Sequence, residues 1–338
     1  MKSFFVPTLA CLLAGVLVSL GGCTAPPPPN QSPDVFSVAL ISDLNSSYGS
    51  TEYEPAVHEG VRLITDEWRP DLVLIAGDLI AGQRVELSDS RVDSMWTAFD
   101  ATVYEPIREA GIPVAFAMGN HDASRYERFA RDRRMAIEHW MGRDLGVEVL
   151  DSLDFPLNYS FRAGPLFVVV WDATNEETIR DERLLDWVRR QLELPEAESA
   201  RHRWIVGHLP LHAVAEGRNR KGEVLAGADT LRRMMVEYDV DVYVSGHHHA
   251  YYPGRRGPLE MLHLGALGQG PRPLIGSNRE PLQAITLATL RTDTLQLDTQ
   301  AFGFDDPAQR ISLELDDLPE RIESINGFVV RRDKPDAY

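Results

Sequence analysis

Cysteine is scarce in this chain of 338 residues, which contains only Cys11 and Cys23. Cys11 lies in an apolar N-terminal run that we expect to be removed, so the mature chain would keep Cys23 alone. No disulfide pair would then be available, and a buried core must hold the fold by itself. The hydrophobic content of 43% is typical of a globular protein.

Basic residues are also few, because 34 Lys and Arg stand against 51 Asp and Glu, for a formal net charge of -17. Such a surface repels the phosphate backbone of nucleic acids unless a basic groove or a bound metal reverses the local field. A dedicated nucleic-acid-binding protein is therefore disfavoured. A metal-dependent nuclease stays open as an alternative.

The apolar run at the N-terminus is too short for a membrane-spanning helix, and a polar, proline-rich stretch follows it directly. We therefore expect residues 1–22 to be a signal peptide. Residues 20–23, Leu-Gly-Gly-Cys, resemble a bacterial lipobox. This resemblance implies lipidation of Cys23 and anchoring to a bacterial membrane on its periplasmic or extracellular side. The proline-rich residues 23–34 are expected to form a stiff, extended tether.

Internal repeats are absent, and short apolar runs alternate with helical patterns from Val35 onward. This alternation predicts an α/β sandwich formed by one domain, residues 35–304. The expected strands are 36–42, 71–78, 112–121, 164–173, 201–208 and 239–249. Three further strands, 259–266, 283–293 and 294–302, have no helices between them and are expected to be antiparallel. Residues 305–338 are expected to be an acidic tail that covers the surface.

Polar residues follow the predicted strands where each strand ends. They are Asp43, Asp78, Asn120 with His121, His208, and the triplet His247–His249. Taken singly, each is more often a capping Asp or a loop histidine. At five successive strand ends they predict one shared crevice, because ligands gather at the carboxyl ends of strands in α/β sheets. Oxygen and nitrogen donors without sulfur suit Mn, Fe or Zn rather than Ca or Mg.

The order of these residues resembles the calcineurin-like metallophosphoesterase family. The matching strings are Asp43-Leu44-Asn45, Gly77-Asp78, Gly119-Asn120-His121-Asp122, Gly207-His208 and Gly246-His247-His248-His249. Position 45 departs from the pattern, because the family usually has His where this chain has Asn. The resemblance implies a four-layer αββα sandwich with mixed sheets and antiparallel C-terminal strands. It also implies a metal-dependent phosphoric ester hydrolase.

The same resemblance implies a role for each residue of the site. Two divalent or trivalent transition-metal ions (Mn, Fe or Zn) would be bridged by Asp78. Asp43, His249 and Asn45 would serve the first metal, and Asn120, His208 and His247 the second. Two metals about 3.5–4 Å apart can clamp a phosphoryl oxygen during in-line attack. His121 would be the general acid, and Asp122 would orient its imidazole ring.

Two details of the site are predicted from the residues themselves. Side chains alternate along an extended segment, so His247 and His249 should face the crevice and His248 should face away. An amide oxygen is a weaker donor to Zn or Fe than an imidazole. The first metal would therefore be held less tightly by Asn45, or Tyr48 would complete its coordination instead.

These observations predict a lipid-anchored hydrolase of small phosphate esters, either monoesters or diesters. Two other functions stay open: a metal-dependent nuclease, and a binding protein whose site is weakened at Asn45. The basic loop Arg218–Gly222 could attract phosphate, although a solvated run of charge is the commoner explanation. His212 could touch substrate, although a position behind the ligands or at the surface is commoner.

Overall fold

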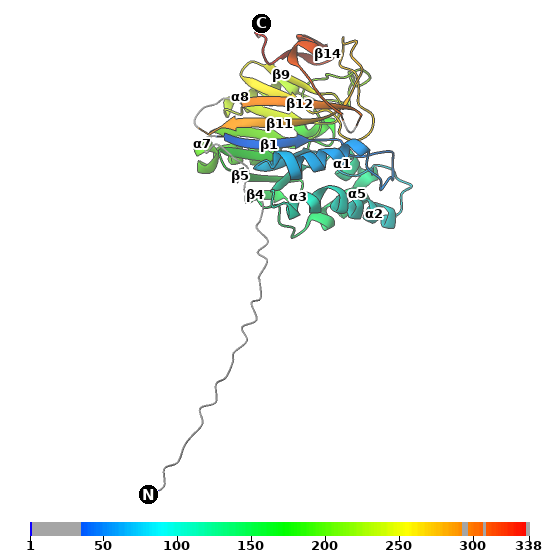
Figure 1. Cartoon of the computed structure of the whole chain (residues 1–338). Helices are drawn as coiled ribbons and strands as arrows, with labels where there is room; N and C mark the ends of the chain where they lie inside the picture. Colours follow the sequence, from blue (N-terminus) through cyan, green and yellow to red (C-terminus); the bar gives the residue numbers. More distant parts are fainter. Residues whose placement is uncertain (2–34, 293–296, 307–308, 336–338) are drawn as a thin grey trace. The chain divides into compact units, whose positions relative to one another are not determined.

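The computed structural model describes residue 1 and residues 35–292, 297–306 and 309–335. The predicted signal peptide, Cys23 and the tether lie outside the described residues. The chain divides into two units, Met1–Gln31 and Ser32–Tyr338, and the helices and strands that the structure describes belong to the second unit (Figure 1). None of the helices described has both the length and the hydropathy needed to cross a bilayer.

The first sheet has six strands in the order β13-β12-β11-β1-β2-β3. Their bounds are β1 Val35–Ile41, β2 Leu72–Ala76, β3 Val114–Ala117, β11 Gln283–Arg291, β12 Leu297–Asp306 and β13 Gln309–Ser312. Strands β1, β2 and β3 are parallel. Strand β11 runs antiparallel to both β1 and β12, and Figure 1 shows these three side by side.

The second sheet has nine strands in the order β14-β15-β9-β10-β8-β7-β6-β5-β4. Their bounds are β4 Glu148–Asp154, β5 Asn158–Ala163, β6 Leu166–Val170, β7 His202–Val206, β8 Val242–Ser245, β9 Tyr252–Arg256, β10 Leu259–His263, β14 Arg321–Ser324 and β15 Gly327–Arg331. Its centre, β6-β7-β8-β10, is parallel, and antiparallel strands extend it at both edges.

Helices flank both sheets. The α-helices are α1 Pro55–Arg62, α2 Asp89–Phe99, α3 Glu105–Glu109, α4 Asn120–Ala123, α5 Ala130–Trp140, α6 Glu182–Leu192, α7 Pro195–Ser199 and α8 Ala228–Glu237. Strands β2 and β6 are buried at every position, so each sheet is covered on both faces at these strands. Helix α1 packs on the first sheet through Gly60, next to Ile285 of β11, whereas α6 and α8 contact the second sheet. The predicted α/β fold with two mixed sheets is confirmed.

The C-terminal part differs from the prediction in two ways. Only β11 and β12 form the expected antiparallel pair, because β10 lies in the other sheet. There β10 is parallel to β8 and antiparallel to β9, a strand that was not predicted. The expected tail is not a surface covering alone, since β13 extends the first sheet and β14 and β15 extend the second. The polar, acidic composition of residues 305–338 suggested an exposed tail, and Arg331 shows why this was misleading. This charged side chain is 2% exposed, and it donates to the carbonyl of Leu318 and pairs with Asp333.

Candidate metal centre

The predicted site residues lie just beyond the carboxyl ends of strands from both sheets. Asp43 follows β1, Asp78 follows β2 and Asn120 follows β3 in the first sheet; His208 follows β7 and His247 follows β8 in the second. The two sheets meet at this point, because the His247 N–H donates to both carboxylate oxygens of Asp43 at 3.1 Å. The strand ends therefore converge on one crevice, as predicted.

Backbone conformation at the site is unusual. Seven non-glycine residues in the described chain have positive φ, and four of them are predicted ligands: Asp43, Asp78, His247 and His249. This region is sparsely populated by non-glycine residues, and such strain concentrates at functional sites. Glycines make room beside these turns, since a Cβ on Gly119 would lie 2.0 Å from Asp78 Oδ1 and one on Gly246 would lie 2.7 Å from Asp43 Oδ2.

Two groups of potential metal ligands share Asp78. One is Asp43, Asp78 and His249, and the other is Asp78, His208 and His247. In each group, one ligand atom from every residue lies within 4.8 Å of the others. The nearest pairs are His208 Nε2 to Asp78 Oδ2 and His249 Nε2 to Asp43 Oδ1, both at 3.3 Å. The grouping around a shared Asp78 is the one expected from the sequence.

Backbone carbonyls fix the orientation of two histidines. His208 Nδ1 lies 2.8 Å from the Ala76 carbonyl oxygen, and His249 Nδ1 lies 2.9 Å from that of Gly270. Because a carbonyl only accepts, Nδ1 carries the hydrogen in both rings. In the neutral form of each ring, Nε2 then has the lone pair and faces the carboxylates, which is the tautomer a metal ligand needs.

Burial and charge act in opposite directions on this cluster. Burial alone would raise the pKa of Asp78, but the charges of His208 and His121 outweigh it and lower the pKa. Burial likewise opposes ionisation of Asp43, and the charge and hydrogen bond of His249 still lower its pKa. The pKa of His208 rises to about 9, because the attraction of Asp78 exceeds the effect of burial. Two buried carboxylates kept ionised favour a cation between them.

The two asparagines offer amide oxygens. Asn120 Oδ1 lies 3.0 Å from His208 Nε2, while its Nδ2 donates to Gln83 Oε1 at 2.8 Å. Its oxygen is thereby turned toward the cluster. Asn45 is 6% exposed, and its Oδ1 is buried without a hydrogen-bond partner among the described residues. An orphaned buried oxygen is costly unless something binds it, so Asn45 fits a ligand of a bound cation.

Tyr48 is the residue that could complete the first metal site in place of Asn45. Its side chain is 53% exposed, and its ring stacks on His121 with 5.1 Å between the ring centroids. It covers the imidazole at the mouth of the site. Asn45 is thus buried and unpartnered among the described residues, whereas Tyr48 is largely exposed.

The donor set therefore fits two transition-metal ions, with carboxylates, imidazoles and amide oxygens in one buried cluster. Residues 36–251 match the family model of the calcineurin-like phosphoesterases. The chain belongs to the calcineurin-like phosphoesterase family. This membership confirms the resemblance carried by the five motifs. No curated protein matches the chain.

Solved structures share the fold at low sequence identity. A purple acid phosphatase from yellow lupin (Lupinus luteus) seeds is 16% identical, with a TM-score of 0.54 over 87% of this chain and 57% of that chain. This chain thus spans little more than half of the lupin enzyme. A dimetal phosphatase from Danio rerio is 17% identical, with a TM-score of 0.50 over 82% of this chain and 98% of that chain. The anchor in the inner membrane complex of Plasmodium is 12% identical, with a TM-score of 0.53 over 83% and 89%.

His121 lies at the edge of the candidate ligand cluster. Its Nε2 is 3.9 Å from Asp78 Oδ2, and its side chain is 18% exposed. Its Nδ1 is buried without a hydrogen-bond partner in the described chain. Burial lowers the pKa of His121, although the charge of Asp78 opposes this.

Asp122 does not orient the imidazole of His121, which corrects the role expected for it. One carboxylate oxygen accepts from the backbone N–H groups of Leu79 and Ile80, both at 2.9 Å, and the other accepts from Gly119 at 2.7 Å. Both oxygens are therefore occupied by backbone. Burial, followed by the charge of Asp78, raises the pKa of Asp122 to about 7. Asp122 braces the loop after β2 against the turn after β3.

The histidine triplet divides as predicted, but for a different reason. Strand β8 ends at Ser245, and His247 and His249 have φ of 65° and 55°, so the segment is a turn rather than an extended strand. His247 and His249 belong to the ligand groups. His248 is buried on the other side, where Nε2 donates to the Glu223 carbonyl and Nδ1 accepts from the Val214 N–H.

This arrangement predicts different defects for the three histidines. His247→Ala and His249→Ala should each lose bound metal and activity. His248→Ala should still bind metal, but its free energy of unfolding should fall by about 1–3 kcal/mol. The Val214 N–H and the Glu223 carbonyl would lose their hydrogen-bond partner. Elemental analysis and thermal melts of the three variants would check this. Equal metal loss in all three would contradict the division.

Glu223 was not predicted as a site residue from the sequence. Its Oε2 lies 2.9 Å from His247 Nε2, so it orients this ring and leaves Nδ1 for a metal. Glu223 also pairs with Arg218 and Arg220 from the basic loop. Burial would raise the pKa of Glu223, but hydrogen bonds from His247 and Arg220 lower it. No spacing signals this contact, because 24 residues separate Glu223 from His247.

Proposed function

We propose that this phosphoesterase is a dinuclear metal-dependent hydrolase of small phosphate esters, either monoesters or diesters. The observation that carries the proposal is the pair of ligand groups that share Asp78. Asp43, Asp78, His249 and Asn45 would hold one ion of Mn, Fe or Zn, and Asp78, Asn120, His208 and His247 the other. When bound, such a pair supplies Lewis-acid charge to a phosphoryl oxygen and lowers the pKa of water.

The chain's own groups would position the ester and handle its proton. The Tyr48 ring stacks on His121, whose Nε2 lies 3.9 Å from Asp78 Oδ2. From there it could donate a proton to the leaving oxygen. Asp122 would keep the loops that carry Asp78 and His121 in register, through its three backbone hydrogen bonds.

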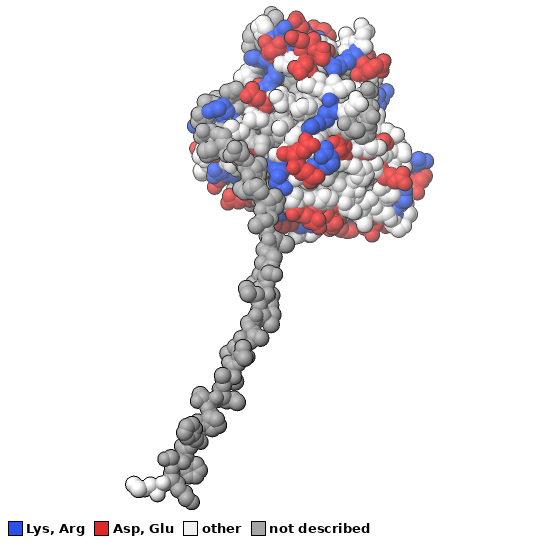
Figure 2. Space-filling model, in the orientation of Figure 1, with Lys and Arg blue, Asp and Glu red and all other residues white. Residues whose placement is uncertain are grey.

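A cavity of ≈ 260 Å³ adjoins the ligands of the second metal. Asn120, His247 and Arg218 line it. This volume suits a small ester better than a folded nucleic acid. On the face shown in Figure 2, acidic side chains form several groups, and basic ones are interspersed without a continuous stripe. The face shown therefore has no continuous basic stripe that could follow the backbone of a duplex.

The test is hydrolysis of 4-nitrophenyl phosphate and bis(4-nitrophenyl) phosphate by the purified protein. We expect chelation to abolish turnover of the preferred ester, and Mn, Fe or Zn to restore it. The same panel separates monoesterase from diesterase activity. Turnover that survives complete removal of metal would refute the dinuclear mechanism.

We also propose that the enzyme acts at the bacterial cell envelope, attached through lipidated Cys23. Leu20, Gly21 and Gly22 before this cysteine support the proposal. Cys23→Ser should give a protein without lipid that separates from membranes, while its metal site is unchanged. Mass spectrometry of the mature N-terminus would measure this. A wild-type chain that starts elsewhere and carries no lipid would mean that the protein is exported without an anchor.

A further inference from the structure

Two loops bring arginines next to the metal centre. The loop after β7 is joined to the loop after β10 by a bridge between Ala215 and Leu274 and by the Glu216 N–H, which donates to the Pro273 carbonyl at 2.9 Å. The Arg272 N–H donates to the His249 carbonyl at 3.0 Å. Arg218 and Arg272 are therefore fixed in position relative to the predicted ligands.

Arg218 faces the cavity. It lines this space together with His247 and Asn120, and its side chain is only 19% exposed. Its Nη1 donates to Glu223, whereas its Nε is buried and has no hydrogen-bond partner in the described chain. A guanidinium carries five N–H donors, so most of them stay available to a ligand.

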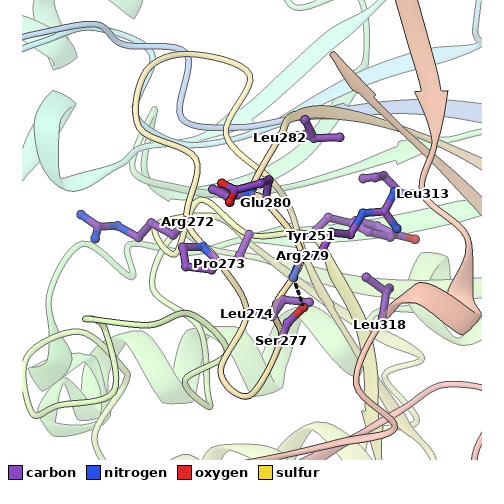
Figure 3. A pocket seen from close by; sticks show the side chains of 12 residues that line it. Tyr251, Arg272, Pro273, Leu274, Ser277, Arg279, Glu280, Leu282, Leu313 and Leu318 are labelled. Carbon is purple, nitrogen blue, oxygen red and sulfur yellow. Dashed lines mark hydrogen bonds between the residues drawn. The ribbon is translucent and has the colours of Figure 1, made fainter. Parts of the chain in front are cut away.

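Arg272 has no carboxylate partner among the described residues, and its Nε is buried and unpaired. Figure 3 shows its guanidinium turned away from the apolar pocket that contains Tyr251 and Leu318. The guanidinium lies instead near the basic loop, with Nη1 3.5 Å from the position that a Cβ on Gly217 would take. Arg279 lines the same pocket, but its charge is paired with Asp317, whereas Arg272 has no such partner among the described residues.

The charges around this point do not balance. Glu223 is shared by Arg218, Arg220 and His247, so one carboxylate faces several cationic or donor groups. Burial, and next the charge of Arg218, lower the pKa of Arg272. In a chain with a formal charge of -17, two neighbouring arginines are not expected to have only one carboxylate, Glu223, between them, and only Arg218 pairs with it. A bound anion would relieve their repulsion, and guanidinium groups bind phosphate by paired hydrogen bonds.

We propose that Arg218 and Arg272 form an anion subsite beside the metal centre, and that the substrate is a phosphate ester with a second phosphoryl group. This inference rests on the proposed function, because the metal centre would take the first phosphoryl group. The two arginines would bind the second phosphoryl group and so raise the affinity for the substrate. The alternative is that Arg218 only holds Glu223 in place.

The experiment uses phosphonates, whose C–P bond resists ester hydrolysis. Binding of propylphosphonate and of α,ω-bisphosphonates with linkers of two to four carbons is measured by calorimetry on the metal-loaded protein. We expect the best bisphosphonate to bind at least about tenfold more tightly than propylphosphonate. A hydrogen bond between charged groups typically changes a dissociation constant by about that factor or more. Arg218→Gln and Arg272→Gln should each remove most of this preference, because each lowers the affinity for the bisphosphonate far more than that for propylphosphonate.

Lys221→Gln is the matched control, because Lys221 is an exposed cation of the same loop. It should keep the preference. An equal loss in Lys221→Gln would mean a long-range field rather than a subsite, and would overturn the proposal. So would a wild-type protein without any preference. Metal analysis of each variant separates loss of the subsite from loss of the Glu223–His247 contact.

The two proposals fail in different ways. Turnover of nitrophenyl esters without a preference for bisphosphonates would refute the subsite and leave the hydrolase standing. A preference that depends on both arginines, in a protein that hydrolyses no phosphate ester, would refute the hydrolase and leave the subsite standing.

Discussion

Asp78→Asn should lose both metal ions and the activity that depends on them. Asp78 belongs to both ligand groups, so its loss cannot be confined to one ion. Removal of a residue that only orients a ligand typically costs 10–100-fold in metal affinity. We expect a loss of at least about 100-fold for this shared ligand, because a charged donor is replaced by a neutral one.

The fold should survive this substitution. Asn has the shape of Asp, and its Oδ1 can still accept from the His121 N–H, which lies 2.9 Å from Asp78 Oδ1. The substitution also removes the repulsion between Asp78 and Asp43, which acts to raise the pKa of Asp43. Elemental analysis and thermal melts with and without metal would measure the effect. Added metal should raise the Tm of the wild type and not that of the variant.

Asp100→Asn is the matched control. Asp100 is 9% exposed and is held by Arg143 and His139, away from the ligand groups. This variant should lose fold stability and keep its metals. If Asp78→Asn binds as much metal as the wild type, the shared-ligand arrangement is wrong.

Strand ends made the metal site predictable from sequence. Asp43, Asp78 and His208 each follow an apolar run, and the topology of an α/β sheet brings such ends together whatever the details of the loops. The same argument placed the strands themselves, since β2 and β6 are wholly apolar and wholly buried. An unbroken apolar run was enough to predict these two strands.

Contacts that depend on tertiary structure were not predictable. Glu223 reaches His247 from a loop whose composition suggests only a solvated charge run. Asp122 stands next to His121 in the chain, yet its carboxylate turns to the backbone of Leu79, Ile80 and Gly119. The prediction for Asp122 was wrong because adjacency in sequence says little about where a buried carboxylate finds its donors. The C-terminal strands β14 and β15 were not predicted for a related reason. A charged residue such as Arg331 suggests an exposed segment, but here it is buried because Leu318 and Asp333 bind it.

His121→Ala should keep both metals and slow turnover by about 10²–10⁴-fold, the usual loss for a general acid. His121 is not in either ligand group, so metal content should match that of the wild type. Its Nδ1 makes no hydrogen bond in the described chain, so truncation leaves no buried partner unsatisfied on that side. The measurement is kcat for a series of phosphate esters that differ in the pKa of the leaving alcohol.

The dependence on leaving group decides the role of His121. An alkoxide needs a proton as it departs, whereas nitrophenolate does not, so the defect should be largest for alkyl esters and shrink for nitrophenyl esters. Tyr48→Phe is the control, because it keeps the ring that stacks on His121 and removes only an exposed hydroxyl. A defect of the same size for every leaving group would mean that His121 positions the ester rather than protonates it. An unchanged rate with a poor leaving group would remove His121 from the chemistry, and the site would then resemble a phosphate-binding centre more than an enzyme's.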